Sequence, residues 1–314
     1  MVGGGSYPVA YRATARGLRS GVNVTVLINP ASGRGRAATL GGAVVEGLRR
    51  AGHDVAVRST HLPSGEPGPT LHATEIGDAL VVVGGDGTLH RALPAAAASG
   101  AGVYHVPAGT ENLFARHFRM SAHPAAVVQA LDRPPIRTDL GMCDGRLFAL
   151  MASVGPDAGV IERLSRRRGG AISHWSYLRP VLAEFGHPRL ARISLEVDGC
   201  RVLDNRRGLL VVANSPQYAA RLDPGRGART DDGRLDVVFF PCESGVDVVC
   251  WAARLWLCTD RPDGCLSWTA RAASVFGREE ATPLQLDGEP AGGLGTNDRP
   301  TKITILGGVL RVFG

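Results

Sequence analysis

Lysine is nearly absent from this sequence: Lys302 is the one lysine among 35 Lys and Arg residues in 314 positions. It lies in the strand-like segment 301–306, which has no glycine loop around it. A Walker A loop and the active site of a protein kinase both place a lysine on the nucleotide phosphates. The shortage of lysine therefore counts against both designs.

Cysteine motifs and long apolar runs are also missing. The six cysteines show no C-x-x-C spacing, and the longest apolar run, 248–258, is interrupted by Arg254 and is shorter than the ~20 residues that span a bilayer. Residues 1–21 hold no continuous apolar block of the kind found in a secretory signal. We therefore expect a cytoplasmic protein with buried thiols rather than disulfides or zinc ligands, and a mobile tail over residues 1–21.

The chain does have a hydrophobic content of 44%, enough to fill the core of one large or two medium domains, and a formal net charge of +6. A positive charge favours an anionic partner, which can be a nucleotide, a nucleic acid or an acidic membrane surface. The sign of the charge alone leaves these three open.

The first half of the sequence alternates strand-like and helix-like segments. Apolar, β-branched strands with their turns are expected at 23–30, 53–60, 79–88 and 102–110, and helices at 35–52, after 88 through 98, and at 111–118. Apolar strands alternating with helices predict a parallel sheet that is covered on both faces. Ligands of such sheets gather at the carboxyl ends of the strands.

The pattern changes after about Leu140. Short alternating strands with turn glycines are expected at 192–199, 201–215, 233–240, 284–290, 302–306 and 309–314, and helices at 173–185 and 246–257. We therefore predict a tail at 1–21, an α/β nucleotide-binding domain at 22–140 and a mainly antiparallel β domain at 141–314. For the helix at 246–257, packing in the core is favoured over a place at a lipid surface.

Three glycine-rich turns, "NPASG", "GGDGT" and "PAGTENL", follow strands of the first half. Their unpaired backbone N–H groups and the following helix dipoles can bind phosphate, with polar candidates Asn29, Ser32, Gly33, Thr110 and Asn112. In the second turn the carboxylate of Asp86 would repel phosphate unless Mg²⁺ lies between them or Asp86 takes a proton from a nucleophile. The alternative is a tight strand-to-helix turn in which Asp86 is a cap.

The ordered set "NPASG", "GGDGT", "PAGTENLFAR", "SVGPDAGV", "ANSPQYAARLDPGRGARTDDGRLDVV" and "LQLDGEP" covers nearly the whole chain after residue 22. This set resembles the diacylglycerol kinase catalytic family, which includes sphingosine kinases, ceramide kinase and bacterial lipid kinases. The resemblance implies an active site in the cleft between the two domains, where ATP and Mg²⁺ meet a lipid hydroxyl. It also implies transfer of the γ-phosphoryl group to a diacylglycerol or sphingoid-type acceptor.

The resemblance also implies roles for individual residues. Asp287 or Glu289 of "LQLDGEP" would accept the proton of the lipid hydroxyl, although Asp-Gly is also a strong hairpin-turn signal, and Asp86 would lie near Mg²⁺. Beside the polar candidates above, the ATP site would comprise Thr60, Gly84, Gly85, Asp86, Gly87, Thr88, Leu89 and His90. A structural Mg²⁺ would take the carboxylate of Asp232 and the carbonyls of Arg229 and Arg234, where an ordinary turn is the alternative.

The chain departs from the family's common "GGDGTxNE" at His90 and Arg91, and from "GTGND" at Glu111 and Leu113. Two alternatives therefore stay open: an NAD kinase, which shares "GGDGT", and a catalytically silent nucleotide- or lipid-binding protein.

The arginine-rich segment 162–170 is either a membrane-facing edge or a solvated loop. We expect peripheral contact with an anionic membrane surface, no nucleic-acid partner, and a possible homodimer.

Overall fold

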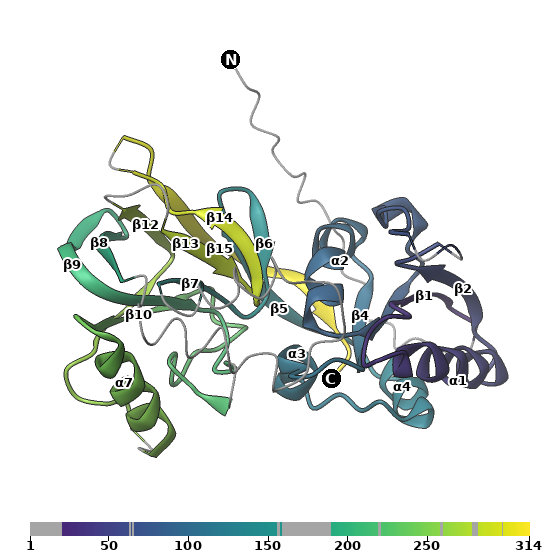
Figure 1. Cartoon of the computed structure of the whole chain (residues 1–314). Coiled ribbons are helices and arrows are strands. Elements are labelled where there is room, and N and C mark those ends of the chain that lie inside the picture. Colours follow the sequence, from purple (N-terminus) through teal and green to yellow (C-terminus); the bar gives the residue numbers. More distant parts are fainter. Residues whose placement is uncertain are drawn as a thin grey trace.

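The computed structural model describes residues 21–62, 64, 66–155, 158, 190–218, 221–257, 260–277, 282–296 and 298–314. The chain forms an α/β half and a β-rich half that share one continuous 15-stranded sheet (Figure 1). The predicted tail up to residue 20, the predicted helix at 173–185 and the arginine-rich segment 162–170 lie outside the described residues.

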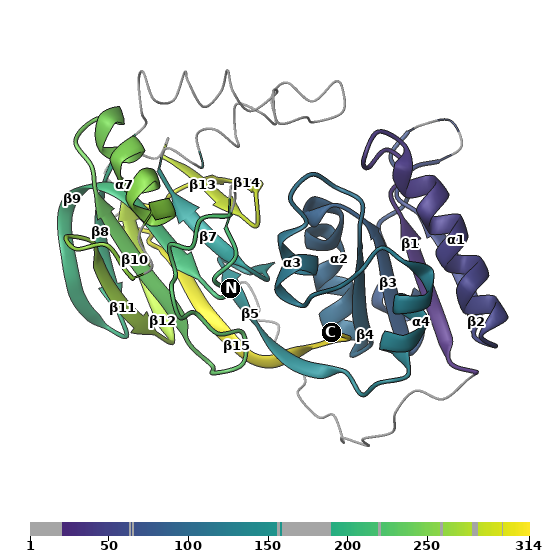
Figure 2. The ribbon, with the colours of Figure 1, turned by 90° about the horizontal axis from the view of Figure 1, so that it is seen from below.

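The N-terminal half is built on parallel strands in the order β2–β1–β3–β4. Helices α1 and α4 cover one face of these strands and α2 covers the other (Figures 1 and 2). The strands are β1 (Asn23–Ile28), β2 (Asp54–Ser59), β3 (Ala79–Gly84) and β4 (Gly102–Pro107). The helices are α1 (Arg36–Arg50), the 3-10 turn η1 (Ala73–Glu75), α2 (Asp86–Ser99), α3 (Leu113–His117) and α4 (Pro124–Leu131). The predicted covered parallel sheet is confirmed.

The C-terminal half is mainly antiparallel, as the alternating pattern predicts. Helix α7 (Gly245–Leu257) lies beside β10 at the edge of this half (Figure 1). The strands are β5 (Ile136–Cys143), β6 (Arg146–Phe148), β7 (Met151–Val154), β8 (Ala191–Val197), β9 (Cys200–Ala213), β10 (Leu235–Pro241), β11 (Leu266–Ala270), β12 (Ala272–Gly277), β13 (Pro283–Leu286), β14 (Glu289–Gly293) and β15 (Thr301–Val312).

Strand β15 joins the two halves. It pairs with β12 near its start, runs antiparallel to β5, and ends parallel to β4, where Arg311 lies opposite Gly102. The prediction of two strands at 302–306 and 309–314 was wrong. The intervening glycines form an irregularity within one strand, between Leu306 and Leu310, in which Gly308 has a φ of 62°.

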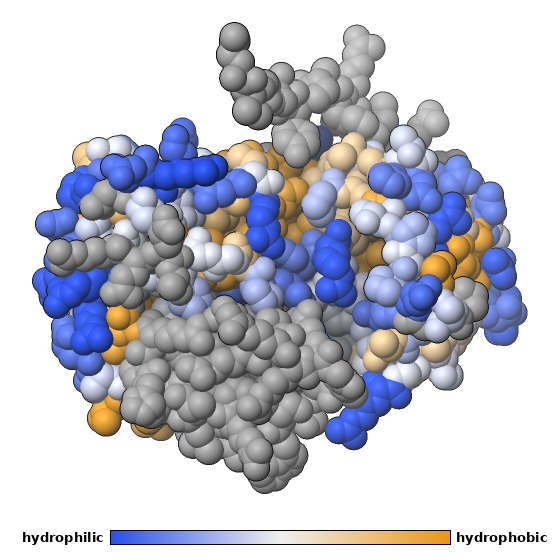
Figure 3. Space-filling model, turned by 45° about the horizontal axis from the view of Figure 1, so that its top comes forward, coloured by the Kyte–Doolittle hydropathy of each residue, from blue (hydrophilic) through white to orange (hydrophobic). Residues whose placement is uncertain are grey.

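The surface differs between the flanks and the middle of the molecule. Hydrophilic side chains cover much of both flanks, whereas apolar surface gathers between the two halves on the face seen in Figure 3. No helix among the described residues is long and apolar enough to cross a membrane.

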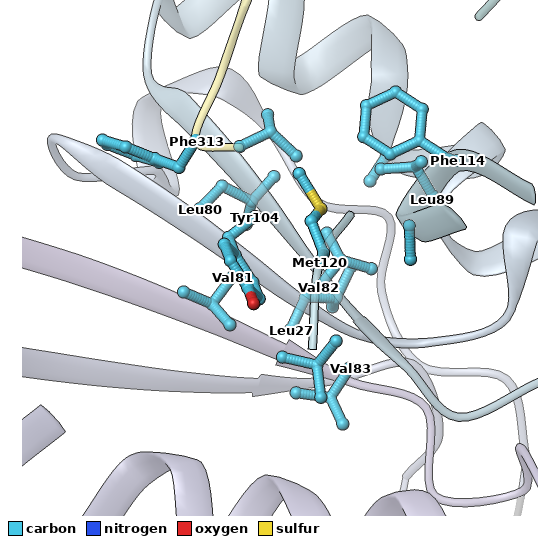
Figure 4. Close-up of a cluster of buried hydrophobic side chains, with 14 of the residues drawn as sticks. Leu27, Leu80, Val81, Val82, Val83, Leu89, Tyr104, Phe114, Met120 and Phe313 are labelled. Carbon is cyan, nitrogen blue, oxygen red and sulfur yellow. The ribbon is translucent and has the colours of Figure 1, made fainter. Parts of the chain in front are cut away.

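The end of the chain packs into the hydrophobic core of the N-terminal half. β3 is buried along its whole length, and α1 buries residues at helical spacing, including Ala37, Val44 and Leu48. Phe313, which follows β15, joins the cluster formed by Leu80, Tyr104 and their neighbours (Figure 4). The two halves therefore share hydrophobic packing as well as strand pairing.

The prediction for the cysteines was partly wrong. The five cysteines in the described part of the chain are free thiols, but Cys200 and Cys250 are exposed rather than buried. Burial raises the pKa of Cys143 and of Cys242 to about 12. The two buried thiols are therefore protonated and unreactive at neutral pH.

Candidate functional site

Three glycine-rich turns meet at the carboxyl ends of β1, β3 and β4. The side-chain amide of Asn29 donates to Thr88 Oγ1 at 2.9 Å, and the Ala108 N–H donates to the Gly84 carbonyl at 2.8 Å. These bonds connect the first turn to the second and the third turn to the second. Parallel strands bring their carboxyl ends to one edge of the sheet, so the turns form one surface there.

Glycine is required in these turns by the close approach of the backbones. A Cβ atom on Gly33, which has a φ of 60°, would overlap the carbonyl oxygen of Ala108. A Cβ on Gly109 would lie 2.6 Å from the Cα of Gly85. The turns are therefore packed on each other through bare backbone, which also lets a phosphate group approach their N–H groups.

Asp86 is the first residue of α2, but its carboxylate accepts a hydrogen bond from another helix, α3. Its Oδ1 accepts a hydrogen bond from the N–H of Phe114 in α3 at 3.2 Å, and the structure records no side-chain cap on α2. The alternative of a turn in which Asp86 caps its own helix was therefore wrong, because the carboxylate bonds to the first turn of the helix that follows the third glycine turn. The carboxylate lies beside the second and third turns and is an oxygen group of the kind that could help to hold Mg²⁺.

His105 lies buried beneath the second turn and was missed by the sequence analysis. Its Nε2 donates to the carbonyl of Gly84 at 3.1 Å, whereas its Nδ1 is buried without a hydrogen-bond partner in the described structure. Burial lowers the pKa of His105, and the negative charge of Asp86 opposes that shift. A histidine inside the apolar strand "GVYHVP" was the available signal.

The C-terminal half brings two acids to the same place on the hairpin of β13 and β14. Asp287 and Gly288 form its two-residue turn, with φ values of 50° and 82°. The Asp287 carboxylate is buried and accepts from the N–H groups of Ala149, Leu150 and Met151 at 2.7, 2.8 and 3.0 Å. His90 Nδ1 lies 3.1 Å from its Oδ2. The hairpin-turn alternative is therefore confirmed, and this hairpin carries both candidate acids.

Glu289, two residues further on, lies against the second glycine turn. A Cβ on Gly87 would overlap Glu289 Oε1, and Arg91 Nη1 lies 3.9 Å from the same oxygen. The two positions at which this chain departs from "GGDGTxNE" thus face the two acids, His90 toward Asp287 and Arg91 toward Glu289. The guanidinium of Arg91 therefore lies opposite a carboxylate from the other half, and the imidazole of His90 lies within hydrogen-bond distance of a second one.

The remaining predicted nucleotide-site residues lie around this edge in different ways. Asn112 closes the third turn, since its Oδ1 accepts from the Gly109 N–H at 2.8 Å. Thr60 lies at the end of β2, where its N–H donates to the Ile28 carbonyl at 3.0 Å. Ser32 is half-buried and Thr110 exposed, whereas the Leu89 side chain is in the hydrophobic core (Figure 4), so only its backbone can reach a nucleotide.

The predicted structural metal loop lies elsewhere. Arg229, Asp232 and Arg234 are exposed, and among the described residues no hydrogen bond or ion pair joins them to Asp86 or Asp287. Asp232 Oδ1 accepts from the Arg234 N–H at 3.0 Å. The described residues contain no cluster of three His, Cys, Asp or Glu side chains. One carboxylate with two carbonyls, or one carboxylate with substrate phosphates, is still an oxygen set of the kind that Mg²⁺ takes.

Asp139 in β5 is a second residue that the sequence analysis missed. It is buried, and its carboxylate oxygens accept from the N–H of Gly308 and the N–H of Gly233, each at 2.7 Å. Asp139 therefore holds the loop at 229–234, where a metal was predicted, and the irregular part of β15 together. An acid within the strand "IRTDLGMC" was the signal for it.

Comparisons with known proteins agree with this arrangement. Residues 23–143 match the family model described as the diacylglycerol kinase catalytic domain. A Pseudomonas aeruginosa protein named probable lipid kinase YegS-like is 32% identical over 281 residues, which cover 86% of this chain and 88% of that protein. A Mycobacterium tuberculosis diacylglycerol kinase is 28% identical over 235 residues, covering 70% of this chain and 74% of the other. The crystal structure of a putative diacylglycerol kinase from Bacillus anthracis matches with a TM-score of 0.70 at 19% identity, covering 93% of this chain and 96% of that one.

Proposed function

The chain belongs to the diacylglycerol kinase catalytic family, and on that premise we propose that it is a lipid kinase that transfers the γ-phosphoryl group of ATP to a lipid hydroxyl. The observation that carries the proposal is the meeting of the glycine turns with Asp287 and Glu289. The turns offer backbone N–H groups to phosphate, and the hairpin offers acids to an acceptor hydroxyl.

We assign proton acceptance to Glu289 and a positioning role to Asp287. Three backbone N–H groups and His90 already surround the Asp287 carboxylate, so protonation there would weaken the contacts that hold the hairpin. Glu289 is half-buried and lies directly on Gly87, at the start of α2. This difference in surroundings supports Glu289 as the group that meets the substrate hydroxyl.

The mechanism follows from these positions. As the lipid oxygen forms its bond to the γ-phosphorus, its proton goes to Glu289, and the bond from the γ-phosphorus to the ADP oxygen breaks. The N–H groups of the second and third turns stabilise the charge on the phosphate oxygens. Asp86 is the carboxylate best placed to hold Mg²⁺, which when bound would neutralise charge on the β- and γ-phosphates.

The acceptor that we propose is a diacylglycerol or a sphingoid-type lipid. The apolar surface between the two halves (Figure 3) suits a lipid with its chains beside the cleft. The names of the relatives, a probable lipid kinase and a diacylglycerol kinase, support the same class. They give no such support to the NAD kinase alternative.

The test is phosphorylation of a panel of acceptors by the purified protein. Labelled ATP with Mg²⁺ is supplied with diacylglycerol, sphingosine or ceramide in mixed micelles, and with NAD as the competing acceptor. We expect a labelled phospholipid. If NADP were the only labelled product, the protein would be an NAD kinase instead. ATP binding without transfer to any acceptor would support the alternative of a catalytically silent binding protein.

A further inference from the structure

Helix α7 has an inner face that packs on the β-rich half. Leu255 is buried, and Trp251 packs its ring on Phe240 with 5.3 Å between the ring centroids. The indole N–H of Trp251 donates to the Pro241 carbonyl at 2.8 Å. This inner face accounts for the core packing that the sequence favoured.

The outer face of α7 is apolar as well, although it is exposed. The residues lie at i, i+3, i+4, i+7, i+10 and i+11, which is one side of a helix. We call them the outer stripe: Val246, Val249, Cys250, Ala253, Trp256 and Leu257. Val246, Trp256 and Leu257 are 70, 72 and 73% exposed. An ordinary surface helix carries polar side chains on this side.

The two charged residues of α7 lie off the outer stripe. Asp247 is turned back to the start of the helix, where its Oδ2 accepts from the N–H groups of Glu243 and Ser244 at 2.9 Å each. The guanidinium of Arg254 lies over the ring of Trp251 at 4.7 Å. The stripe therefore has no charge within it, and it carries a tryptophan of its own, Trp256, a residue type that is common where a protein meets a lipid headgroup layer.

The size of the stripe argues against a second copy of the chain as its occupant. Thirteen helical residues extend about 20 Å, so a stripe about 10 Å wide offers on the order of 200 Å². A stable protein interface needs about 800 Å² from each partner. A lipid surface needs no matched partner area, because an interfacial helix enters it by a single apolar face.

We propose that the outer stripe of α7 docks the protein on the surface of an anionic phospholipid bilayer. The proposal rests on the proposed function, because an acceptor with long acyl chains resides in a bilayer and an enzyme that uses it has to reach that surface. The formal net charge of +6 favours approach to an anionic surface. Trp256 and Leu257 then enter the headgroup layer.

The experiment compares binding of variants to vesicles of phosphatidylglycerol and phosphatidylcholine by cosedimentation. The test variant is Trp256→Ser/Leu257→Ser. The control is Val57→Ser/Ile136→Ser, which removes apolar side chains that are 41 and 53% exposed outside α7. We expect the test variant to partition about tenfold or more weakly than wild type, because two large apolar side chains no longer enter the bilayer. The control should bind as wild type does.

Three results would overturn the proposal: equal vesicle binding by the test variant and wild type, no binding by wild type, or a wild-type dimer that the test variant converts to a monomer. Brominated lipids supply a second readout, since they should quench tryptophan fluorescence in wild type more than in Trp256→Phe. Circular dichroism of both double variants checks that they fold.

Vesicle binding does not depend on catalysis, so failure of the docking proposal can be told from failure of the proposed function. If the protein phosphorylates lipid, the test variant should keep its activity on a dissolved short-chain diacylglycerol and lose it on vesicles. If no lipid is phosphorylated while vesicle binding still depends on the stripe, the proposed function fails and the docking surface stands.

Discussion

At Gly87 the nucleotide half of the site touches an acid from the other half. The atom that a new Cβ would meet is the end of the flexible Glu289 side chain rather than backbone. Gly87→Ala should therefore fold normally and displace the Glu289 carboxylate. A displacement of about 1 Å at a reacting group costs on the order of 100-fold in rate, so we expect a loss of 10- to 100-fold in kcat.

The matched control for Gly87→Ala is Gly42→Ala, also within a helix, where a new Cβ would meet nothing within 4 Å. Gly42→Ala should keep full activity and gain about 0.5–1 kcal/mol in the free energy of unfolding. Steady-state kinetics and urea unfolding of both variants check the prediction. Full activity in Gly87→Ala would contradict the placement of Glu289.

The two acids of the hairpin should differ in what they do for stability. The Asp287 carboxylate accepts hydrogen bonds from three backbone N–H groups. In Asp287→Asn, one of its two oxygens becomes an NH₂ group, which is itself a donor and cannot accept them. We expect the free energy of unfolding to fall by about 1–3 kcal/mol, since a buried N–H loses its acceptor. Glu289→Gln should change it little, and equal losses in urea unfolding would argue against separate roles for the two acids.

Among the elements, the irregular part of β15 permits a comparison between two adjacent glycines. Gly308 has a φ of 62°, whereas no such constraint applies to Gly307, and a Cβ on either would have only ordinary contacts. Gly308→Ala should cost about 1–2 kcal/mol through the left-handed backbone alone, and Gly307→Ala should be nearly neutral. Thermal or urea unfolding of the two variants measures the difference, and equal effects would rule out backbone strain as the cause.

The strands of the parallel sheet could be predicted because each is an apolar block that ends at a glycine or polar turn. The short helix α4, with "PAAVVQAL" between two loops, carries little local signal and was missed. The sequence analysis predicted two strands where β15 is one, because it took the glycine pair at 307–308 for a turn. A glycine pair can equally form an irregularity within a strand, which here is held by Asp139. The position of Gly308 opposite Asp139 depends on residues 169 positions apart.

The site was predictable to a similar degree. The three turns carry their own local signals, and the resemblance predicted that the hairpin acids lie near them, as the contacts of His90 and Gly87 bear out. What local sequence could not supply is the pairing of His90 with Asp287, which are 197 positions apart, or the supporting role of His105. Such contacts depend on how β13, β14 and α2 meet in the folded chain. The sequence analysis therefore treated His90 and Arg91 only as departures.

For the molecule as a whole, His105 and the half-buried His117 contribute to the response of stability to acid. The pKa of His105 is lowered in the folded protein, while in the unfolded chain it is about 6.5. As the pH falls below about 6.5, the unfolded state binds a proton that the folded state does not, so stability falls by up to about 1.4 kcal/mol per pH unit for this residue. Burial of His117 lowers its pKa and adds to the loss with the same sign.

Urea unfolding between pH 5 and pH 8 tests this account. His105→Gln keeps a side-chain N–H for the Gly84 carbonyl but does not titrate, so its stability should fall less steeply below about pH 6.5 than that of wild type. The difference between the two proteins isolates His105 from His117. Identical slopes would contradict the assignment.

The central claim is that glycine turns from one half and Glu289 from the other form a single phosphoryl-transfer site. The most direct measurement is single-turnover transfer of label from ATP to lipid by wild type and Glu289→Gln, with ATP affinity measured in parallel. The account predicts that Glu289→Gln binds ATP as wild type does and transfers at a rate lower by about 100-fold or more, the usual contribution of a general base. Transfer at the wild-type rate by Glu289→Gln would contradict it.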